Sequence, residues 1–354
     1  MDKVLISMPV KPSERKNVGN IIAPALCDYL GDVLDAKKFL TVNLIHSYDN
    51  TEQYLSRYLD NVENFGIKYD ALFKDVDYCD EILNIIEDML NIGIIKTGIE
   101  RILRCECGRV ELSYNGVRKK NNASLYTIIN NKLICNCCHK ECKEYKINIL
   151  YIPLENEKIT EVMVTPSLLS KCVNGKNKEM AGTKFIISKT RNTGYSIFYK
   201  GNTYFIDADF MWMNLFRVID ANEKILICGN KQSLKVFYIN YIYSVYKSQK
   251  MHFILHPFVN NINNNLSDIS SNYNLLNKLV ILFNLSWNRE TCAWNDSIYS
   301  FLSKLTKPQL QYLYDIICDI PQNIINSNLD SSKKLEIILK YGTNLQNKKR
   351  FLRN

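Results

Sequence analysis

The sequence lacks the two patterns that would direct a chain into or across a membrane. Met1 is followed at once by Asp2 and Lys3, so the amino terminus has neither the apolar core nor the small-residue cleavage site of a signal peptide. The longest apolar runs, such as Leu279–Phe283, are far shorter than the roughly 20 residues that cross a bilayer. We therefore expect a cytoplasmic protein with no membrane partner.

Both common nucleotide-binding fingerprints are also missing. No G-x-x-x-x-G-K-[ST] and no G-x-G-x-x-G occurs in the chain, which excludes a P-loop and a standard dinucleotide site. Any nucleotide site must therefore use another fold.

Charged residues are few enough to exclude general disorder. They make up 23% of the chain against 46% hydrophobic residues, which is sufficient for a sizeable core. A length of 354 residues predicts two domains, or one domain with insertions. The net charge of +9 permits a polyanionic partner without requiring one, and we expect no DNA partner.

Cysteine is sparse for a disulfide-stapled protein, but half of it lies in one segment. Six of the 12 cysteines fall in a Cys-Glu-Cys-Gly turn and a later Cys-Asn-Cys-Cys-His turn with one cysteine beyond it. Two short-spaced pairs can supply the four soft ligands of a tetrahedral zinc ion, and we expect Cys105, Cys107, Cys135 and Cys138. Because four thiolates leave no open coordination position, this zinc would be structural.

Other ligand sets are open at this stage. Cys137, His139 and Cys142 compete for the second pair of ligands. Four of the cysteines can instead hold an iron–sulfur cluster, or all six can be unligated thiols.

The spacing of apolar residues indicates alternating strands and helices. Lys3–Val10 is a short β-branched run that predicts a strand, and a helical pattern follows from Val18 to Leu30, with Gly31 expected to stop it. Phe39–Ile45 predicts a second strand. This alternation is typical of an α/β fold with a parallel sheet.

The pattern continues to the carboxyl end, interrupted by the cysteine-rich segment and by an Asn- and Ser-rich loop at residues 260–274. Further helices are expected at Thr51–Gly66, Tyr78–Ile92, Ser233–Tyr246, Lys304–Cys318 and Lys333–Tyr341, and further strands at Phe185–Ser188, Tyr195–Tyr199, Lys224–Cys228 and Phe253–Leu255. We expect residues 1–103 and 152–275 to be two halves of a nucleotide-binding core, 104–151 a zinc-binding insertion, and 276–354 a C-terminal helical domain.

The junction of the first strand and first helix carries a motif of a known family. Pro12-Ser13 precedes Asn17-Val18-Gly19-Asn20, which resembles the HIGH signature of class I aminoacyl-tRNA synthetases, with Asn17 in place of the first histidine. In that family the glycine lets adenine approach the backbone. A helix that starts after a strand also favours phosphate binding, because its free N–H groups and positive dipole end face the ligand.

Later segments follow the order of that family. Leu44–Asp49 is similar to its acidic turn, and Phe205–Trp212 resembles the segment that lines its amino-acid pocket. Ile225–Gln232 resembles the strand and G-x-D-H turn, and Asp268–Asn272 resembles the KMSKS loop without its lysine. With the zinc-type insertion, the set is most similar to class I lysyl-tRNA synthetase, and arginyl- and glutamyl-type enzymes are close competitors.

The resemblance implies a Rossmann-like core that forms an aminoacyl-adenylate, with ATP, Mg²⁺ and Zn²⁺ as cofactors. The implied partners are an amino acid and tRNA or another aminoacyl acceptor. By the same resemblance, the catalytic residues are Lys16, Asn17, Asn20 and Ser270; the ATP-binding residues are Pro12, Ser13, Gly19, Gly229, Asn230, Lys231, Ile269 and Ser271; and the substrate-binding residues are Ser7, Asp49, Asp209 and Trp212.

Some of these residues have a simpler alternative role. Trp212 can be a core residue, and Asp209 can cap the following helix. His252 and His256 flank an apolar strand and are expected to pack rather than to catalyse.

Two functions are consistent with the sequence. One is an ATP-dependent aminoacyl ligase, including a truncated biosynthetic paralogue, since residues 276–354 are few for anticodon recognition. The other is a synthetase-like protein without catalysis that binds tRNA, aminoacyl-tRNA or a partner protein, because the signature histidines and the loop lysine are replaced.

Overall fold

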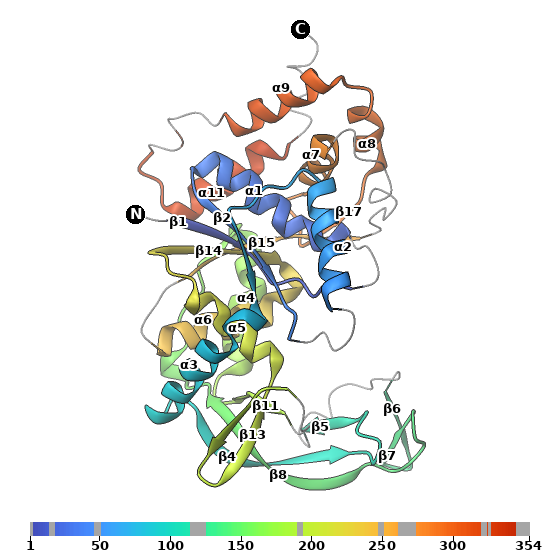
Figure 1. The fold of residues 1–354 in the computed structure, drawn as a ribbon, viewed down its shortest axis with the longest axis vertical. Coiled ribbons are helices and arrows are strands. Elements are labelled where there is room, and N and C mark those ends of the chain that lie inside the picture. The colour runs from blue at the N-terminus through green and yellow to red at the C-terminus, as the bar shows by residue number, and fades with distance from the viewer. Residues whose placement is uncertain are drawn as a thin grey trace. The chain divides into compact units, whose positions relative to one another are not determined.

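The chain folds into two compact units. The computed structural model describes residues 3–13, 18–45, 51–113, 125–189, 194–246, 251–260, 274–319, 324 and 327–344 (Figure 1). The first unit comprises Met1–Cys79, Asn156–Ala181 and Trp212–Asn354, and the second comprises Asp80–Glu155 and Gly182–Met211. The cysteine-rich segment expected at 104–151 thus belongs to a larger second unit.

The first unit is built on a six-stranded sheet in the order β3-β2-β1-β14-β15-β9. The pairings between these six strands are all parallel, as the alternating pattern predicts. The strands are β1 (Lys3–Ser7), β2 (Lys37–Val42), β3 (Ala71–Lys74), β9 (Val164–Thr165), β14 (Glu223–Gly229) and β15 (His252–His256).

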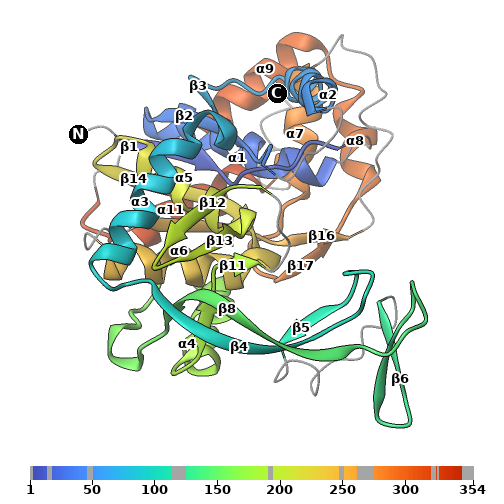
Figure 2. The same cartoon turned by 60° about the horizontal axis from the view of Figure 1, so that its bottom comes forward.

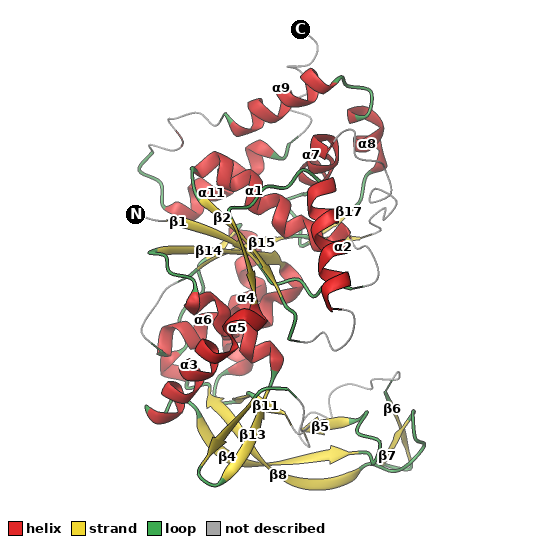
Figure 3. Ribbon diagram, in the orientation of Figure 1, coloured by secondary structure: helices red, strands yellow, loops and turns green. Residues whose placement is uncertain are grey.

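Both faces of the central strands are buried, which explains their continuous apolar runs. Leu5, Ile225 and Ile254 point into one core cluster, and their neighbours Ile6 and Leu226 are fully buried on the opposite face. Helices α1 (Ile22–Leu34) and α7 (Asn274–Asn284) cover one face, and α6 (Ser233–Val245) covers the other (Figure 3).

The first helix does not stop at Gly31, contrary to expectation. It continues to Leu34 and ends at Asp35, whose φ of 48° gives a left-handed cap. Gly31 serves packing instead, because a Cβ at this position would collide with the Lys38 side chain.

The remaining helices agree closely with the apolar spacing of the sequence. No described helix is long and apolar enough to span a membrane. The other elements of the first unit are η1 (Val18–Ile21), α2 (Thr51–Asn64), η2 (Asp75–Tyr78), η3 (Asn156–Lys158), α4 (Ser167–Met180), η4 (Asn230–Gln232), α8 (Asp296–Leu302), α9 (Lys307–Cys318), α11 (Ser331–Gly342), and the short parallel pair β16 (Phe258–Asn260) and β17 (Thr291–Ala293).

The second unit is mainly antiparallel. Its longest strands, β4 (Lys96–Arg104) and β8 (Lys143–Pro153), form a curved ribbon that leads to the hairpin of β6 (Tyr126–Ile129) and β7 (Lys132–Cys135) (Figure 2). The other strands are β5 (Glu111–Ser113), β10 (Lys184–Ile186), β11 (Ser188–Lys189), β12 (Ser196–Tyr199) and β13 (Asn202–Ile206). Two helices, α3 (Cys79–Asn91) and α5 (Ala208–Val218), run from one unit into the other.

Candidate functional site

The order of the parallel strands creates a switch point between β1 and β14. From β1 the chain continues to β2 and β3 on one side, and from β14 it continues to β15 on the other. The two strands are in register from Lys3 opposite Glu223 to Ser7 opposite Ile227, so their carboxyl ends lie together. In open α/β sheets the loops diverge at such a point and leave a crevice for a ligand.

Two groups of residues predicted to bind ATP lie in the segments that follow these two strands. The loop after β1 contains the buried Pro12 and the exposed Ser13, and it leads into η1 with Gly19 and Asn20. The turn after β14 contains Gly229, followed by the Asn230 and Lys231 of η4. The structure therefore brings together segments that are more than half the chain apart in sequence.

The helices that start at this edge have uncapped amino termini. In α1 the N-cap residue Ile21 makes no side-chain cap hydrogen bond, and the first turn has no acidic residue. The same holds for α6, whose N-cap residue is Gln232. Each of these helices continues a short 3-10 helix, η1 or η4, and its positive dipole end lies on the side of the carboxyl edge, which suits a phosphate group.

The η4 turn has one polar atom without a protein partner. Asn230 donates from Nδ2 to the Glu290 carbonyl oxygen at 2.6 Å, but its Oδ1 is buried and accepts no hydrogen bond. The Lys231 ammonium lies 3.2 Å from the centroid of the Phe258 ring. A ligand with an N–H or O–H donor would satisfy the Asn230 oxygen.

Gly229 leaves room for a neutral histidine. A Cβ at Gly229 would come within 3.2 Å of the His256 ring. Burial lowers the pKa of His256 to about 4, so the ring is uncharged at neutral pH. His252, in the same strand, also has its pKa lowered to about 4 by burial and shares a 2.8 Å hydrogen bond with the Thr165 hydroxyl. Both histidines are packed, as expected.

Trp212 is a core residue whose indole N–H is bound. Its exposed fraction is 2%, and with the Asn43 amide in its better orientation the indole Nε1 donates to the Asn43 oxygen at 3.3 Å. The Asn43 nitrogen then donates to Asp75 at 3.0 Å. The Asp75 carboxylate also accepts from the Leu44 N–H at 2.7 Å, which fixes the backbone just after β2.

Sequence reasoning missed this Asn43–Asp75 pair. Asp75 follows a short strand in a segment with a second aspartate, Asp77, and nothing in the local pattern distinguishes the two. The structure distinguishes the two aspartates, because Asp75 is fully buried and Asp77 is exposed.

Two predicted substrate ligands have other contacts. The Ser7 hydroxyl is buried between strands, where it donates to the Phe39 carbonyl and accepts from the Thr41 N–H, so it is directed to β2 rather than to the edge. At the start of α5 the capping carboxylate belongs to Asp207, which accepts from the Asp209 N–H at 2.8 Å. Asp209 itself lies in the first turn of the helix.

The other predicted site residues cannot be placed. Lys16, Asn17, Asp49, Ile269, Ser270 and Ser271 lie outside the described residues.

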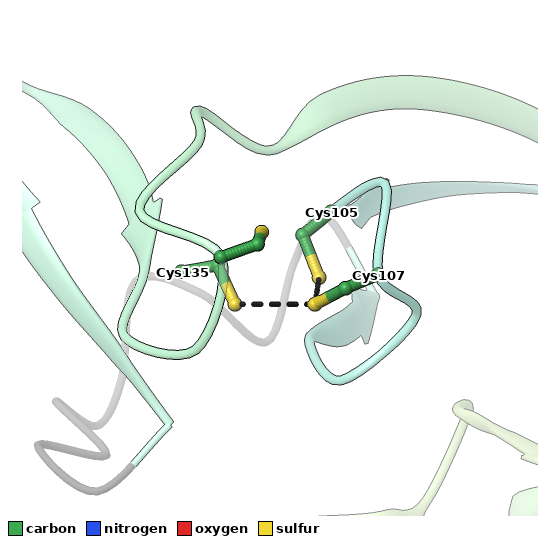
Figure 4. Close-up of side chains that lie close together, drawn as sticks. Cys105, Cys107 and Cys135 are labelled. Carbon is green, nitrogen blue, oxygen red and sulfur yellow. Dashed lines mark hydrogen bonds between the residues drawn. The ribbon is translucent and has the colours of Figure 1, made fainter.

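In the second unit, the four cysteines predicted as metal ligands form one group. The sulfur atoms of Cys105, Cys107, Cys135 and Cys138 all lie within 4.8 Å of one another. Cys105 and Cys107 come from one loop and Cys135 from another, and the Cys107 sulfur lies between the other two (Figure 4). In the part of the chain that the structure describes, Cys137, His139 and Cys142 are outside this group.

Both loops have the same local geometry. The N–H of Cys105 donates to Val110 O, and the N–H of Cys135 donates to Lys140 O, five residues further on in each case. Each loop closes through a residue with positive φ, Gly108 at 69° and His139 at 56°. The first sulfur of each pair also accepts a backbone N–H, from Val110 at 3.2 Å and from Cys137 at 3.4 Å.

The thiols influence one another's ionisation. Burial opposes ionisation of Cys105, but hydrogen bonds from the Val110 N–H and from neighbouring thiols outweigh it and lower the pKa to about 7. The Arg109 N–H favours the Cys107 thiolate, yet the hydrogen bond with Cys105 and the other thiols raises the pKa of Cys107 to about 12. The Cys107 thiolate therefore forms at neutral pH only around a cation.

The donor set fits a metal ion that prefers thiolates. Sulfurs bound to one zinc ion lie about 3.8 Å apart, given a Zn–S bond of about 2.3 Å in a tetrahedron. The Cys105–Cys107 and Cys107–Cys135 sulfur distances are 3.2 and 3.6 Å. A small movement of these side chains would admit the ion.

Comparison with known proteins gives a match in structure but not in sequence. No protein-family model matches the chain, and no curated protein matches it. The crystal structure of Mycobacterium tuberculosis methionyl-tRNA synthetase bound by methionyl-adenylate has a TM-score of 0.61 and 10% identity, covering 90% of this chain and 71% of that one.

Two further structures of that synthetase agree. Another complex with methionyl-adenylate has a TM-score of 0.58 at 10% identity, covering 96% of this chain and 81% of its own. The apo form has a TM-score of 0.61 at 10% identity, with coverages of 96% and 78%. All three structures are of a methionyl-type enzyme, so they do not support the lysyl type in particular. The chain has the α/β fold of a class I aminoacyl-tRNA synthetase.

Proposed function

We propose that this protein is an ATP-dependent aminoacyl ligase that forms an aminoacyl-adenylate and transfers the aminoacyl group to tRNA or another acceptor. The observation that carries the proposal is the edge between β1 and β14, where two uncapped helix amino termini and the predicted ATP-binding turns meet. The shared fold with a synthetase whose structure contains methionyl-adenylate supports it.

Adenylate formation requires hydrogen-bond donors and cations that stabilise negative charge, and it does not require a side chain that accepts a proton. The amino-acid carboxylate attacks the α-phosphorus of ATP, the bond to the β-phosphate oxygen breaks, and pyrophosphate leaves. Negative charge grows on the phosphate oxygens, and fixed N–H groups and cations stabilise it. Mg²⁺, when bound, would neutralise part of the charge on the phosphates.

Residues of the described edge can take these roles. Asn20 and the first turn of α1 would face the phosphates, and Gly229 would let the nucleoside approach the backbone. Lys231 would supply a cation from the η4 turn. The Asn230 Oδ1, which has no protein partner, would accept a hydrogen bond from a ligand hydroxyl. Lys16, Asn17 and Ser270 keep the catalytic roles that the sequence resemblance implies.

The zinc site would have a structural role. Bound by four thiolates, Zn²⁺ would join the two loops of the cysteine group and leave no coordination position for substrate. We expect its loss to unfold this part of the second unit without removing any group from the proposed ATP site.

The amino acid is open to experiment. The sequence resemblance points to a lysyl-type enzyme, whereas the similar structures are methionyl enzymes. A burial of 98% leaves Trp212 little surface for a substrate in this conformation, so we propose that it supports the pocket wall through Asn43.

A non-catalytic role is the second candidate. The specific observation in its favour is that His252 and His256 are buried and uncharged at neutral pH, so neither replaces the missing signature histidines as a cation. Such a protein would bind tRNA, aminoacyl-tRNA or a partner protein.

ATP–pyrophosphate exchange separates the two functions. Full-length protein loaded with zinc is tested with each standard amino acid, with and without tRNA. We expect exchange above background with one amino acid or a few chemically similar ones. A null result across the whole panel would exclude the ligase, and tRNA binding with a steep salt dependence would then support the second candidate.

A further inference from the structure

The first unit contains a cavity that shares no lining residue with the described part of the proposed ATP site. Its volume is about 550 Å³, within the range of small-molecule sites. The walls come from the last turn of α1, the loop between α2 and β3, and the first turns of α7 and α9. All of these elements belong to the first unit.

The cavity lies at the opposite edge of the parallel sheet. The loop from Gly66 to Asp70 enters β3, and Lys38 is at the start of β2, so both mark the amino ends of their strands. The proposed ATP site is at the carboxyl ends. None of the described residues of the proposed ATP site lines the cavity, and an inference about the cavity does not depend on the proposed function.

The carboxylates of α1 at the cavity, the buried Asp28 and the exposed Asp32, are already paired. Asp28 is fully buried and accepts from Lys278 Nζ at 2.5 Å, from Lys38 Nζ at 2.9 Å and from the Lys68 N–H at 3.0 Å. Asp32 accepts from Lys38 Nζ at 2.8 Å and from the Tyr314 hydroxyl at 2.6 Å.

The wall carries a surplus of positive charge. Lys68, Lys278 and Lys307 line the cavity, with Asp32 as its one lining carboxylate among the described residues. Counting Lys38 and Asp28 beneath them, four ammonium groups face two carboxylates, and the difference is two positive charges.

Two of the lysines are available to a ligand. Among the described residues, the ammonium groups of Lys68 and Lys307 have no carboxylate partner. Two other acids lie nearby: Asp70 accepts from the Lys38 N–H, and Asp315 accepts from Gln311 Nε2, but neither lines the cavity.

Helix ends add to the positive potential. Asn274 and Leu275 are the first residues of α7, and Lys307 is the first residue of α9, so two positive dipole ends meet at the cavity. Gly66, with φ of 61°, lets the α2–β3 loop approach α7, since a Cβ there would lie 3.0 Å from Asn274 Cβ.

We propose that this cavity binds the phosphate group of a small phosphorylated molecule. Two ammonium groups without a carboxylate partner among the described residues match the charge of a phosphate dianion, and the dipole ends of α7 and α9 add positive potential at the same wall. A volume of about 550 Å³ suits a small molecule rather than a nucleic-acid backbone, which binds along an extended groove.

The test uses full-length protein, with ribose 5-phosphate and inorganic phosphate as probes and ribose as the uncharged control. Lysine acetylation is measured by mass spectrometry with and without each probe. We expect both phosphates to protect Lys68 and Lys307 and to leave Lys171, an exposed lysine of α4, unprotected. Equal acetylation of all three lysines with and without probe would overturn the proposal.

Substitution gives an independent readout. Lys68→Gln with Lys307→Gln should weaken ribose 5-phosphate binding in equilibrium dialysis by about tenfold or more, because two charge-assisted contacts are lost. Lys171→Gln, with the same loss of charge per residue, should bind as the parent does. The two pocket lysines are exposed, so the variants should fold.

The other outcomes are equally decisive. Binding unchanged in the double variant would contradict the proposal. A second result would also contradict it. If a single-stranded RNA 12-mer binds in a way that depends on Lys68 and Lys307, and neither phosphate probe binds, the surface is an RNA-binding surface.

Discussion

The sulfur atoms of Cys107 and Cys135 lie 3.6 Å apart although they come from different loops. This contact joins two turns of matching geometry, each with a backbone N–H directed at its first sulfur. An arrangement of this kind is typical of a structural zinc site.

Zinc content tests the cysteine group. Purified protein should contain about one equivalent of zinc by elemental analysis, as expected for a single four-thiolate site. Cys107→Ser or Cys135→Ser should remove most of it, whereas Cys172→Ser, a thiol of α4 in the first unit, should not. Less than half an equivalent in the parent protein, or full retention in the ligand variants, would contradict the assignment.

The buried histidines predict a loss of stability in acid. In the folded state the pKa values of His252 and His256 are about 4, below the ordinary value of 6.5. Stability is therefore fully present above pH 6.5 and declines as the pH falls towards 4. Each group should cost about 1–2 kcal/mol between about pH 7.5 and pH 5.

Urea unfolding followed by tryptophan fluorescence measures this effect in the first unit, where all three tryptophans lie. His256→Asn should reduce the loss of stability on acidification, and His139→Asn in the second unit should leave it as in the parent. An identical pH dependence in the His256 variant and the parent would show that this ring does not take up a proton in the unfolding transition.

Asp75 should be a stabilising residue, unlike its neighbour Asp77. Asp75→Asn weakens a buried charged acceptor of the Leu44 and Ile45 N–H groups, and we expect it to cost about 1.5–3 kcal/mol. Asp77→Asn removes an exposed charge and should change stability by less than about 0.5 kcal/mol. Equal stability of the two variants in urea unfolding would refute the role of Asp75.

Lys231 tests the η4 turn as part of the ATP site. Lys231→Gln should raise the KM for ATP in the exchange reaction by about tenfold, with less change in the KM for the amino acid, because one cation near the phosphates is lost. Lys171→Gln serves as the control of equal charge. An unchanged KM for ATP would place this side chain outside the site.

Local patterns were sufficient to predict the central strands and several helices of the first unit, because β1, β14 and β15 have unbroken apolar runs and α2, α6 and α9 have helical spacing. The spacing of the cysteines likewise identified the four that meet. The prediction that the first helix stops at Gly31 was wrong. A glycine is needed there because the side chain of Lys38, from the next strand, packs against it.

What could not be predicted depends on strand order and burial. The loop with Pro12 and the turn with Gly229 follow neighbouring strands only because β14 pairs with β1, and no local pattern specifies that pairing. The Asn43–Asp75 pair and the lysine-lined cavity could not be predicted from the sequence for the same reason, because each is formed by segments that are separated along the chain.

The most direct test of the central claim is a crystal structure with a sulfamoyl analogue of the aminoacyl-adenylate, chosen for the amino acid that supports exchange. We predict that the analogue binds at the carboxyl ends of β1 and β14, with its sulfamoyl group at the first turn of α1 and its nucleoside against Gly229. An analogue bound elsewhere on the protein, or no binding of any analogue in the series, would contradict the account.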